Sequence, residues 1–266
     1  MDQITNIANL EDKRGARGRE GRGGECSQCV VQNLCLARGF EQADRDAVQQ
    51  IISGTRIARR NEAICQQGEP LKHLMIVRSG SVKRVMHSPT GEQHILSFHL
   101  PGHVIGFDAM ATGNHPAMAG ALETSSLCLI PVKSLEQLSM TNPRVHGRVM
   151  QSAALSIVEG HERSRLLSRR AAEQRIAGFI VMLAKHQAAR RLDARHFDLP
   201  MARQDIASYL CLAFETVSRV LSAMNADGVI SVEHRALEIL DPARLAALAE
   251  EPLFADAVQA SRREVG

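Results

Sequence analysis

The sequence predicts an α+β chain in which an N-terminal antiparallel β-roll is followed by one long helix and a C-terminal winged helix-turn-helix. In the first half, short apolar runs alternate with evenly spaced turn residues, a pattern typical of an antiparallel sandwich or barrel. A stretch without strand signals follows, from 143 to about 168. Two short helical patterns joined by a three-residue turn, and then a hairpin pattern, predict the C-terminal unit.

Length and composition limit the classes of protein that remain. A chain of 266 residues can bury a sizeable core and has room for two domains. The net charge of +3 permits nucleic-acid binding without requiring it. Seven Phe, one Tyr and no Trp argue against stacking on single-stranded nucleic acid. No apolar run reaches 18 residues, and residues 1–22 lack the apolar core of a signal peptide, so we expect a cytoplasmic protein without membrane contact.

Residues 1–25 are predicted to form a disordered basic tail. Residues 11–25 contain five glycines and five basic side chains with almost no apolar surface to bury. Contact of its arginines with DNA phosphate is the alternative, and a solvated arm is favoured. A C-terminal tail is expected over 251–266.

Three cysteines close together are candidate metal ligands. Cys26, Cys29 and Cys35 form a C-x2-C-x5-C pattern, and in a reducing compartment six cysteines are expected to bind metal, catalyse or lie buried. The x2 spacing lets two sulfurs of one turn reach the same centre, in iron–sulfur and zinc sites alike. Cys128 stands alone downstream, and Cys65, in an apolar run, is expected in the core. An iron–sulfur cluster, zinc and unligated cysteines all remain open at this point.

A sensory segment with its β-roll is expected over 26–142. A short helix over Gln42–Ile52 has apolar residues at helical spacing. The predicted strands include the apolar runs Leu74–Val77, Val82–Val85, Ile95–Phe98 and Leu127–Val132. Turn glycines recur every 11 or 12 residues at Gly68, Gly80, Gly91, Gly102 and Gly113. The strand pattern is expected to continue to about Pro143.

A long dimerisation helix is expected over 143–170. Its small and apolar side chains are spaced alternately three and four apart, a seam that can pair with its copy in a second subunit. The seam consists of Met150, Ala153, Ile157, Gly160 and Ser164. The alternative is a helix packed on its own β-roll, and the homodimer is favoured because a DNA-binding end suits two-fold symmetry.

A DNA-binding domain is expected over 171–250. Ala171–Arg190 is helical, and Arg203–Leu210 and Phe214–Asn225 form the helix-turn-helix. Val229–Val232 and Leu237–Leu240 form a hairpin wing. The exposed face of the second helix carries the candidate base-reading residues, whose side chains suit base edges in double-stranded DNA. These residues are Glu215, Ser218 and Arg219. An ordinary solvated helix face is the alternative.

Three separated stretches carry a resemblance to the CRP/FNR family of bacterial transcription regulators, and within it to the oxygen-sensing members. They are C-x2-C-x5-C over Cys26–Cys35, G-F-D-A-M with ALETSSLC over Gly106–Cys128, and ETVSR over Glu215–Arg219. The similarity covers nearly everything from Cys26 to about Leu248.

The resemblance implies a jelly-roll domain of the cyclic-nucleotide-binding type and a homodimer that activates transcription. It implies a [4Fe–4S] cluster on the four cysteines that match the family's ligands, Cys26, Cys29, Cys35 and Cys128. It further implies that oxygen converts or destroys the cluster, weakens the dimer and releases a TTGAT-type palindrome. The loop of Gly91 and Glu92 resembles the family's contact with RNA polymerase.

Four alternative functions compete with the one that the resemblance implies. A cyclic-nucleotide receptor is disfavoured because the stretch Gly106–Ala117 contains no Arg for the phosphate. A cluster-bearing redox enzyme is disfavoured because no nucleotide-binding or nucleophile motif is found. A regulator sensing another ligand or redox state, and a constitutive DNA-binding protein, also remain.

The helix-turn-helix departs from the family's pattern at three positions. Cys211 stands where the family commonly has Gly, and Ala202 and Ala213 stand where it often has capping Ser or Thr.

Overall fold

The computed structural model describes residues 26–88 and 91–251, so the predicted basic tail of 1–25 and residues 252–266 lie outside the described part. The described helices are η1 (Cys26–Gln28), α1 (Gln42–Ile51), η2 (Asp108–Ala111), α2 (Val132–Thr141), α3 (Pro143–Ser168), α4 (Ala172–Ala189), α5 (Arg203–Leu210), α6 (Phe214–Ala226) and α7 (Pro242–Leu248). The strands are β1 (Gly54–Ala58), β2 (Ala63–Cys65), β3 (His73–Ser79), β4 (Val82–His87), β5 (Gln93–His99), β6 (Val104–Ile105), β7 (Met118–Ala121), β8 (Ser125–Pro131), β9 (His196–Asp198), β10 (Ile230–Glu233) and β11 (Ala236–Ile239).

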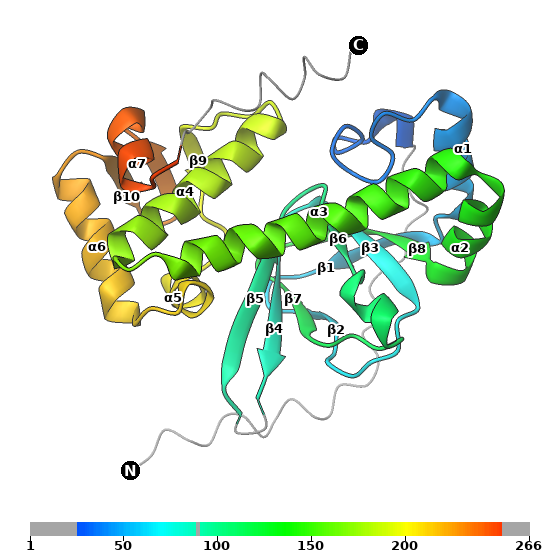
Figure 1. Ribbon diagram of the computed structural model, residues 1–266, viewed down its shortest axis with the longest axis horizontal. Coiled ribbons are helices and arrows are strands. Elements are labelled where there is room, and N and C mark those ends of the chain that lie inside the picture. Colours follow the sequence, from blue (N-terminus) through cyan, green and yellow to red (C-terminus); the bar gives the residue numbers. More distant parts are fainter. Residues whose placement is uncertain (1–25, 89–90, 252–266) are drawn as a thin grey trace.

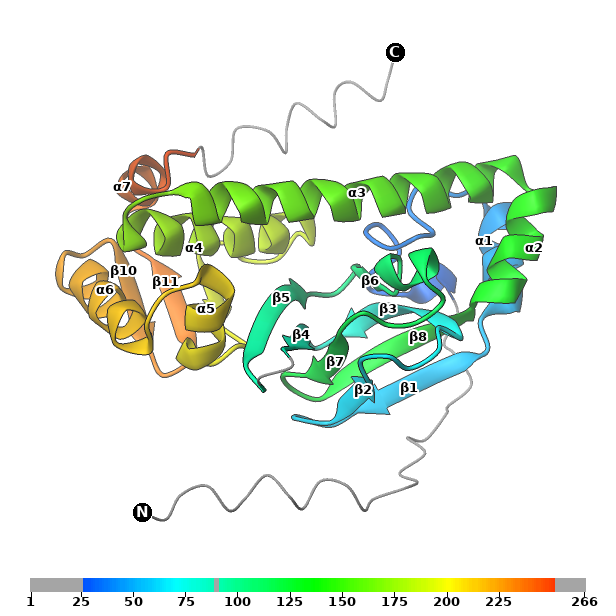
Figure 2. The same ribbon diagram turned by 60° about the horizontal axis from the view of Figure 1, so that its bottom comes forward.

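The predicted β-roll is confirmed as two antiparallel four-stranded sheets, ordered β1-β8-β3-β6 and β2-β7-β4-β5 (Figures 1 and 2). Alternate side chains of the strands point inward and form one core, in which Cys65 is buried as expected. The five recurring glycines all adopt positive φ, between 76° and 102°, which a side chain with a Cβ rarely tolerates. The glycine spacing therefore marks real turns of the roll.

The sequence reading was wrong between Pro131 and Pro143, where strand pattern was expected. β8 ends at Pro131, and residues 132–141 form the helix α2. Val132, Leu135 and Leu138 recur every three residues and turn toward the core that α2 shares with α1 and the start of α3. This spacing was a helical signal that the preceding apolar run concealed.

The long helix α3 runs across the molecule from α2 to the C-terminal domain (Figures 1 and 2). Asn142 caps its N-terminus by accepting hydrogen bonds from the backbone N–H groups of Arg144 and Val145, and Pro143 follows at the first helical position. Of its 26 residues, Val145 and Leu166 alone are buried within the described chain. An amphipathic helix of this length that buries so little leaves most of its surface for other contacts.

The winged helix-turn-helix is confirmed in the C-terminal domain. α4, α5, α6 and the sheet β10-β11-β9 enclose a core that also takes in residues of β4 and β5. Phe98 on β5, Phe179 on α4 and Tyr209 on α5 form an aromatic cluster, with ring centroids 5.0 to 6.0 Å apart. Lys83 on β4 also pairs with Asp205 at 2.7 Å. The β-roll and the DNA-binding domain therefore share a packed junction.

Within the described ranges, no single helix is both long and apolar enough to cross a membrane.

Candidate functional site

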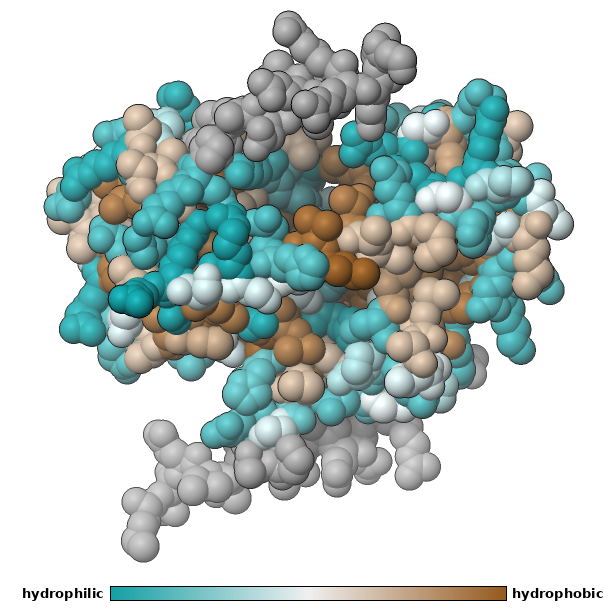
Figure 3. All heavy atoms as spheres, in the orientation of Figure 1, coloured by the Kyte–Doolittle hydropathy of each residue, from teal (hydrophilic) through white to brown (hydrophobic). Residues whose placement is uncertain are grey.

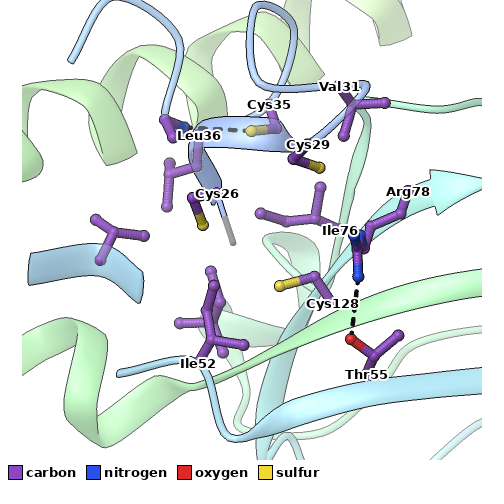
Figure 4. Close-up of a pocket in the computed structure, with 13 residues that line it drawn as sticks. Cys26, Cys29, Val31, Cys35, Leu36, Ile52, Thr55, Ile76, Arg78 and Cys128 are labelled. Carbon is purple, nitrogen blue, oxygen red and sulfur yellow. Dashed lines mark hydrogen bonds between the residues drawn. The ribbon is translucent and has the colours of Figure 1, made fainter. Parts of the chain in front are cut away.

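The four candidate cysteines line one pocket between the N-terminal loop and the β-roll (Figure 4). Cys26, Cys29 and Cys35 come from η1 and the turns that follow it, and Cys128 comes from β8. The cavity has a volume of about 30 Å³. The other lining residues are mostly apolar: Val31, Leu36, Ala37, Val48, Ile52, Thr55, Ile76, Arg78 and Ile130.

Short-range hydrogen bonds shape the cysteine loop. The N–H of Cys29 donates to the carbonyl of Cys26 at 3.3 Å, and that of Cys35 donates to Val31 at 2.9 Å. The backbone N–H of Cys26 donates to the Gln49 side chain on α1 at 3.0 Å. Successive turns thus bring the three cysteines of the loop to one pocket, and α1 holds the beginning of the loop.

Sheet register brings Cys128 to the same pocket. It lies on β8 opposite Thr55 of β1 and Ile76 of β3. Its neighbours Leu127 and Leu129 point into the core of the roll, so Cys128 points outward, toward the loop. Closure of the sheet is therefore the step that joins the fourth cysteine to the first three.

Burial dominates the electrostatics of the pocket. It raises the pKa of Cys35 to about 11 and that of Cys128 to about 12, and it also raises the pKa of Cys26. The Arg78 guanidinium opposes this effect at Cys26 and Cys128 by lowering their pKa. The backbone N–H of Ala37 donates to Cys35 Sγ at 3.4 Å. The thiols of Cys26, Cys35 and Cys128 are therefore protonated at neutral pH, and metal loading at these residues releases protons.

The donor set fits an iron–sulfur cluster. All four residues are free cysteines, and each of Cys26, Cys29 and Cys35 raises the pKa of Cys128, which reflects their proximity. No three His, Cys, Asp or Glu side chains in the described ranges are arranged around a point where one metal ion would bind. Four cysteine thiolates are the ligand set of iron–sulfur clusters and also of zinc sites.

A second cavity, of about 370 Å³, lies between the β-roll and α3. Gly106–Ala117 contributes no Arg to it, as the sequence shows, but the fold brings an arginine from another strand. Arg84, which is only 4% exposed, reaches the cavity from β4. Its guanidinium pairs with Asp108 at 2.8 Å and donates to the carbonyl of Ala117 at 3.4 Å. The charge is already matched by a carboxylate, so an anionic ligand would have to displace Asp108.

The predicted DNA-binding face lies on α6, whose apolar side is buried through Val217, Leu221 and Met224. Glu215 and Arg219 are exposed on the opposite side. Ser218 is half-buried, and its hydroxyl has no hydrogen-bond partner among the residues described. The structure thus presents two of the three predicted base-reading side chains fully to solvent.

The departures expected in the helix-turn-helix are present. Cys211 adopts a left-handed conformation, with φ of 53°, at the C-cap of α5. Ala202 and Ala213 occupy the N-caps of α5 and α6 without a side-chain cap. Asp205 compensates in part by accepting a hydrogen bond from the Ala202 N–H at 3.2 Å.

The predicted polymerase-contact residues Gly91 and Glu92 are exposed at the tip of the β4–β5 hairpin. Residues 89 and 90, next to them, lie outside the described part.

The predicted dimer seam is uncovered within the single chain. Met150, Ile157, Gly160 and Ser164 are exposed, and Ala153 is half-buried. Leu155 and Val158, about half exposed, add to the apolar surface of α3. Figure 3 shows apolar side chains gathered near the middle of the face over which α3 runs.

Sequence reasoning missed three residues that contact these sites. Arg78 lines the cysteine pocket, Arg84 reaches the second cavity, and Asp44 of α1 contacts the N-terminus of α3. No local pattern marks them, because each is placed by contacts between distant segments.

Comparison with known proteins agrees with this architecture. A family model described as a cyclic nucleotide-binding domain matches residues 55–142, and one described as a Crp-like helix-turn-helix domain matches residues 174–248. The chain is 37% identical over 224 residues to the transcriptional activator protein Anr of Pseudomonas protegens, covering 84% of this chain and 92% of that protein. It is 35% identical over 224 residues to the fumarate and nitrate reduction regulatory protein of Salmonella typhi, covering 84% and 90%.

The solved structure of FixK2 from Bradyrhizobium japonicum matches with a TM-score of 0.67 and 29% identity, covering 73% of this chain and 96% of that one. A β-roll joined by a long helix to a winged helix-turn-helix defines a DNA-binding regulator. The chain belongs to the CRP/FNR family of transcription regulators. Its relatives are regulators and not enzymes.

Proposed function

We propose that the protein is an oxygen-responsive transcription activator of the cytoplasm. In the absence of oxygen, Cys26, Cys29, Cys35 and Cys128 hold a [4Fe–4S] cluster, and the chain forms a homodimer on a TTGAT-type palindrome. The dimer contacts RNA polymerase through the loop of Gly91 and Glu92. Oxygen converts or destroys the cluster, the dimer weakens and DNA is released. The names of relatives such as the anaerobic regulatory protein of Pasteurella multocida, 37% identical over 216 residues, support this proposal.

The observation that carries the proposal is the meeting of two distant segments in one apolar pocket. A loop with three cysteines and an outward-facing cysteine of β8 line the same cavity. The cluster would supply a group that reacts with oxygen. The protein supplies the thiol ligands, the apolar walls that exclude water, and the contacts that connect the pocket to α3.

One route from the pocket to α3 is a shared core. Cys35 and Leu36 of the loop are buried in the same apolar cluster as Val48 of α1 and Val145 of α3. A loop that relaxes when the cluster is lost therefore disturbs the packing under the first turn of α3.

A polar contact on α1 forms a second route. Asp44, 8% exposed, accepts a hydrogen bond from the Asn142 side chain at 2.8 Å and pairs with Arg144 at 3.4 Å. Asn142 is the N-cap of α3. Because Gln49 on the same helix holds Cys26, α1 contacts the cysteine loop and the start of α3 at once. Movement of α1 would loosen the beginning of the dimerisation helix.

Anaerobic purification tests the proposal directly. The protein should be coloured and should contain about four irons and four sulfides per chain, the content of one [4Fe–4S] cluster. Air should then abolish both the colour and binding to a fluorescent TTGAT palindrome in parallel. A colourless, sulfide-free protein that binds DNA equally with and without air would sink the proposal.

Two cysteine variants provide a matched pair for this experiment. Cys128→Ala removes a predicted ligand and should abolish the colour and the oxygen-sensitive binding. Cys65→Ala removes a buried cysteine of the β-roll core and should leave both unchanged. Equal loss of colour in the two variants would point to general destabilisation.

The cavity between the β-roll and α3 supports a second candidate, a regulator that senses a ligand there. Its volume of about 370 Å³ falls in the range of small-molecule sites, and Arg84 lines it. Isothermal titration with cyclic AMP and cyclic GMP tests this candidate. We expect no binding while Asp108 pairs with Arg84, and binding by Asp108→Ala alone would identify the carboxylate as the block.

A further inference from the structure

The cysteine pocket has little to offset the charge that it is proposed to hold. An iron–sulfur cluster bound by four thiolates carries a net negative charge, and a buried charge is costly unless it is paired. Among the 13 residues that line the pocket, Arg78 is the single charged side chain. The remaining walls are apolar, apart from Thr55 and the cysteines.

The sheet directs Arg78 to the pocket. It lies on β3 two residues after Ile76, which is opposite Cys128 on β8. Val77, between them, is fully buried in the core of the roll, and the pairing of β3 with β8 shifts between Val77 and Ser79, so Arg78 has no partner residue on β8. Ile76 and Arg78 both line the cysteine pocket. Figure 4 shows Arg78 next to Cys128, with its guanidinium directed toward Thr55.

Arg78 is anchored and is not neutralised. Its Nη1 donates to Thr55 Oγ1 at 3.3 Å, and Thr55 is 8% exposed on β1, opposite Cys128. No carboxylate within 26–88 or 91–251 forms an ion pair with Arg78, whereas Arg56 and Arg84 of the roll each have one. Its positive charge therefore remains available to the pocket.

The charge of Arg78 reaches both segments that supply cysteines. Arg78 lines the same pocket as Cys26 of the loop and Cys128 of β8. The guanidinium of Arg45 donates to the carbonyl of Phe40 and does not line the pocket.

We infer that Arg78 is the charge-balancing residue of the cysteine pocket, which offsets the negative charge of a thiolate-bound iron–sulfur cluster and raises its reduction potential. The inference rests on the proposed function. Arg78 acts on the cluster through space, by the positive charge of its guanidinium, and is not one of its ligands. Cluster potentials respond to nearby charge and to hydrogen bonding, so this role has a direct measurement.

The test compares anaerobic wild type with Arg78→Gln, Arg78→Lys and Arg38→Gln. Arg38 is an exposed arginine of the same loop and controls for loss of charge. The one-electron midpoint potential is measured by titration with dithionite, followed by electron paramagnetic resonance. Arg78→Gln should shift the reduction equilibrium about tenfold toward the oxidised form, or ~59 mV for one electron. Arg78→Lys should recover most of the shift, and Arg38→Gln should show none.

The outcomes separate this inference from the proposed function. A wild-type protein without a cluster defeats the proposed function itself. A loaded wild type whose potential is unchanged in Arg78→Gln overturns the role of Arg78 alone. If Arg78→Gln cannot be loaded while Arg78→Lys can, the requirement for charge is supported. If neither variant can be loaded, Thr55→Val is measured instead, because it removes the hydrogen bond that holds the Arg78 guanidinium at the pocket. A midpoint potential below that of the wild type supports the role of Arg78, and an unchanged potential overturns it.

Discussion

Arg219 lies exposed on α6, one turn beyond Glu215, on the face that is predicted to enter the major groove. Arg219→Ala should weaken binding to the TTGAT palindrome by roughly 1–3 kcal/mol and relax the preference at one base position. Fluorescence anisotropy on operators substituted at single positions measures both effects. Lys72→Ala, on an exposed site of the β-roll, serves as the control. An equal loss on every operator would make Arg219 a phosphate contact.

Cys211 occupies the left-handed C-cap of α5, where a Cβ is unfavourable. Cys211→Gly should therefore raise the free energy of unfolding of the DNA-binding domain by about 1 kcal/mol. Urea unfolding followed by circular dichroism measures the change. Cys211→Ala, which keeps the Cβ, should give no such gain, and a gain of equal size would show that the backbone is not the cause.

The sequence alone could predict the cysteines but not the residues that complete their pocket. Cys26, Cys29 and Cys35 are adjacent in the chain, and their spacing is a local signal. Arg78 resembles any other strand arginine in the sequence, and only the folded β-roll places it in the lining of the cysteine pocket. Its contribution to the site is a property of sheet closure, which local patterns do not encode.

At the scale of elements, α1 contacts both the cysteine loop and the start of α3. Asp44→Ala removes the carboxylate that binds Asn142 and Arg144 and leaves the half-buried Asn142 amide without this partner. We expect unchanged iron content but about tenfold weaker anaerobic dimerisation, equivalent to ~1.4 kcal/mol. Sedimentation velocity measures the dimer. Asp46→Ala, on the exposed side of α1, should leave dimerisation unchanged. Dimerisation of Asp44→Ala as strong as that of the wild type would show that the contact between α1 and α3 does not affect the dimer.

The strands and helices illustrate which elements local patterns can reveal. β3, β4 and β5 were recognisable because each contains a short apolar run and turn glycines recur between the runs. The helix α2 was missed because its ten residues follow directly on the apolar run of β8. The spacing of apolar residues changes from that of a strand to that of a helix at Pro131 without an intervening loop. Burial against α1 and α3 stabilises the helix more than its own propensity does.

At the scale of the whole molecule, the uncovered stripe of α3 predicts association. Ile157, 62% exposed in the single chain, lies at the centre of the predicted seam. Ile157→Glu should raise the dimer dissociation constant at least about tenfold, since it removes roughly 1.5–3 kcal/mol of apolar burial and brings like charges together. Analytical ultracentrifugation under nitrogen measures this. Leu192→Glu, 49% exposed outside α3, should have no effect, and a matching loss would argue against the seam.

Three histidines lie where the β-roll, α3 and the DNA-binding domain meet. The rings of His99 and His103 are 6.0 Å apart, and those of His103 and His186 are 4.9 Å apart. Burial lowers the pKa of each, that of His186 to about 3, although Glu159 of α3 opposes the effect at His103. The folded protein therefore holds them neutral.

These depressed pKa values predict a loss of stability in acid. Unfolded histidine takes up a proton near pH 6.5, whereas the folded state does so only at lower pH, so stability is present above 6.5 and falls below it. The loss should be about 1 kcal/mol per histidine for each pH unit. Thermal unfolding between pH 7.5 and 5 measures the slope. His186→Phe should reduce the slope of stability against pH, and the variant of an exposed histidine, His94→Gln, should leave it unchanged. The same slope in His186→Phe and the wild type would refute the assignment of the acid loss to the buried histidines.

The topology of the cysteine pocket also dictates an order of biogenesis. Cys26, Cys29 and Cys35 leave the ribosome well before Cys128, because synthesis proceeds from the N-terminus at ≈ 5–20 residues per second. Cys128 takes its place only when β8 pairs with both β1 and β3. A nascent chain that ends before β8 offers three thiols and no enclosed pocket. Insertion of the proposed cluster should therefore follow completion of the β-roll.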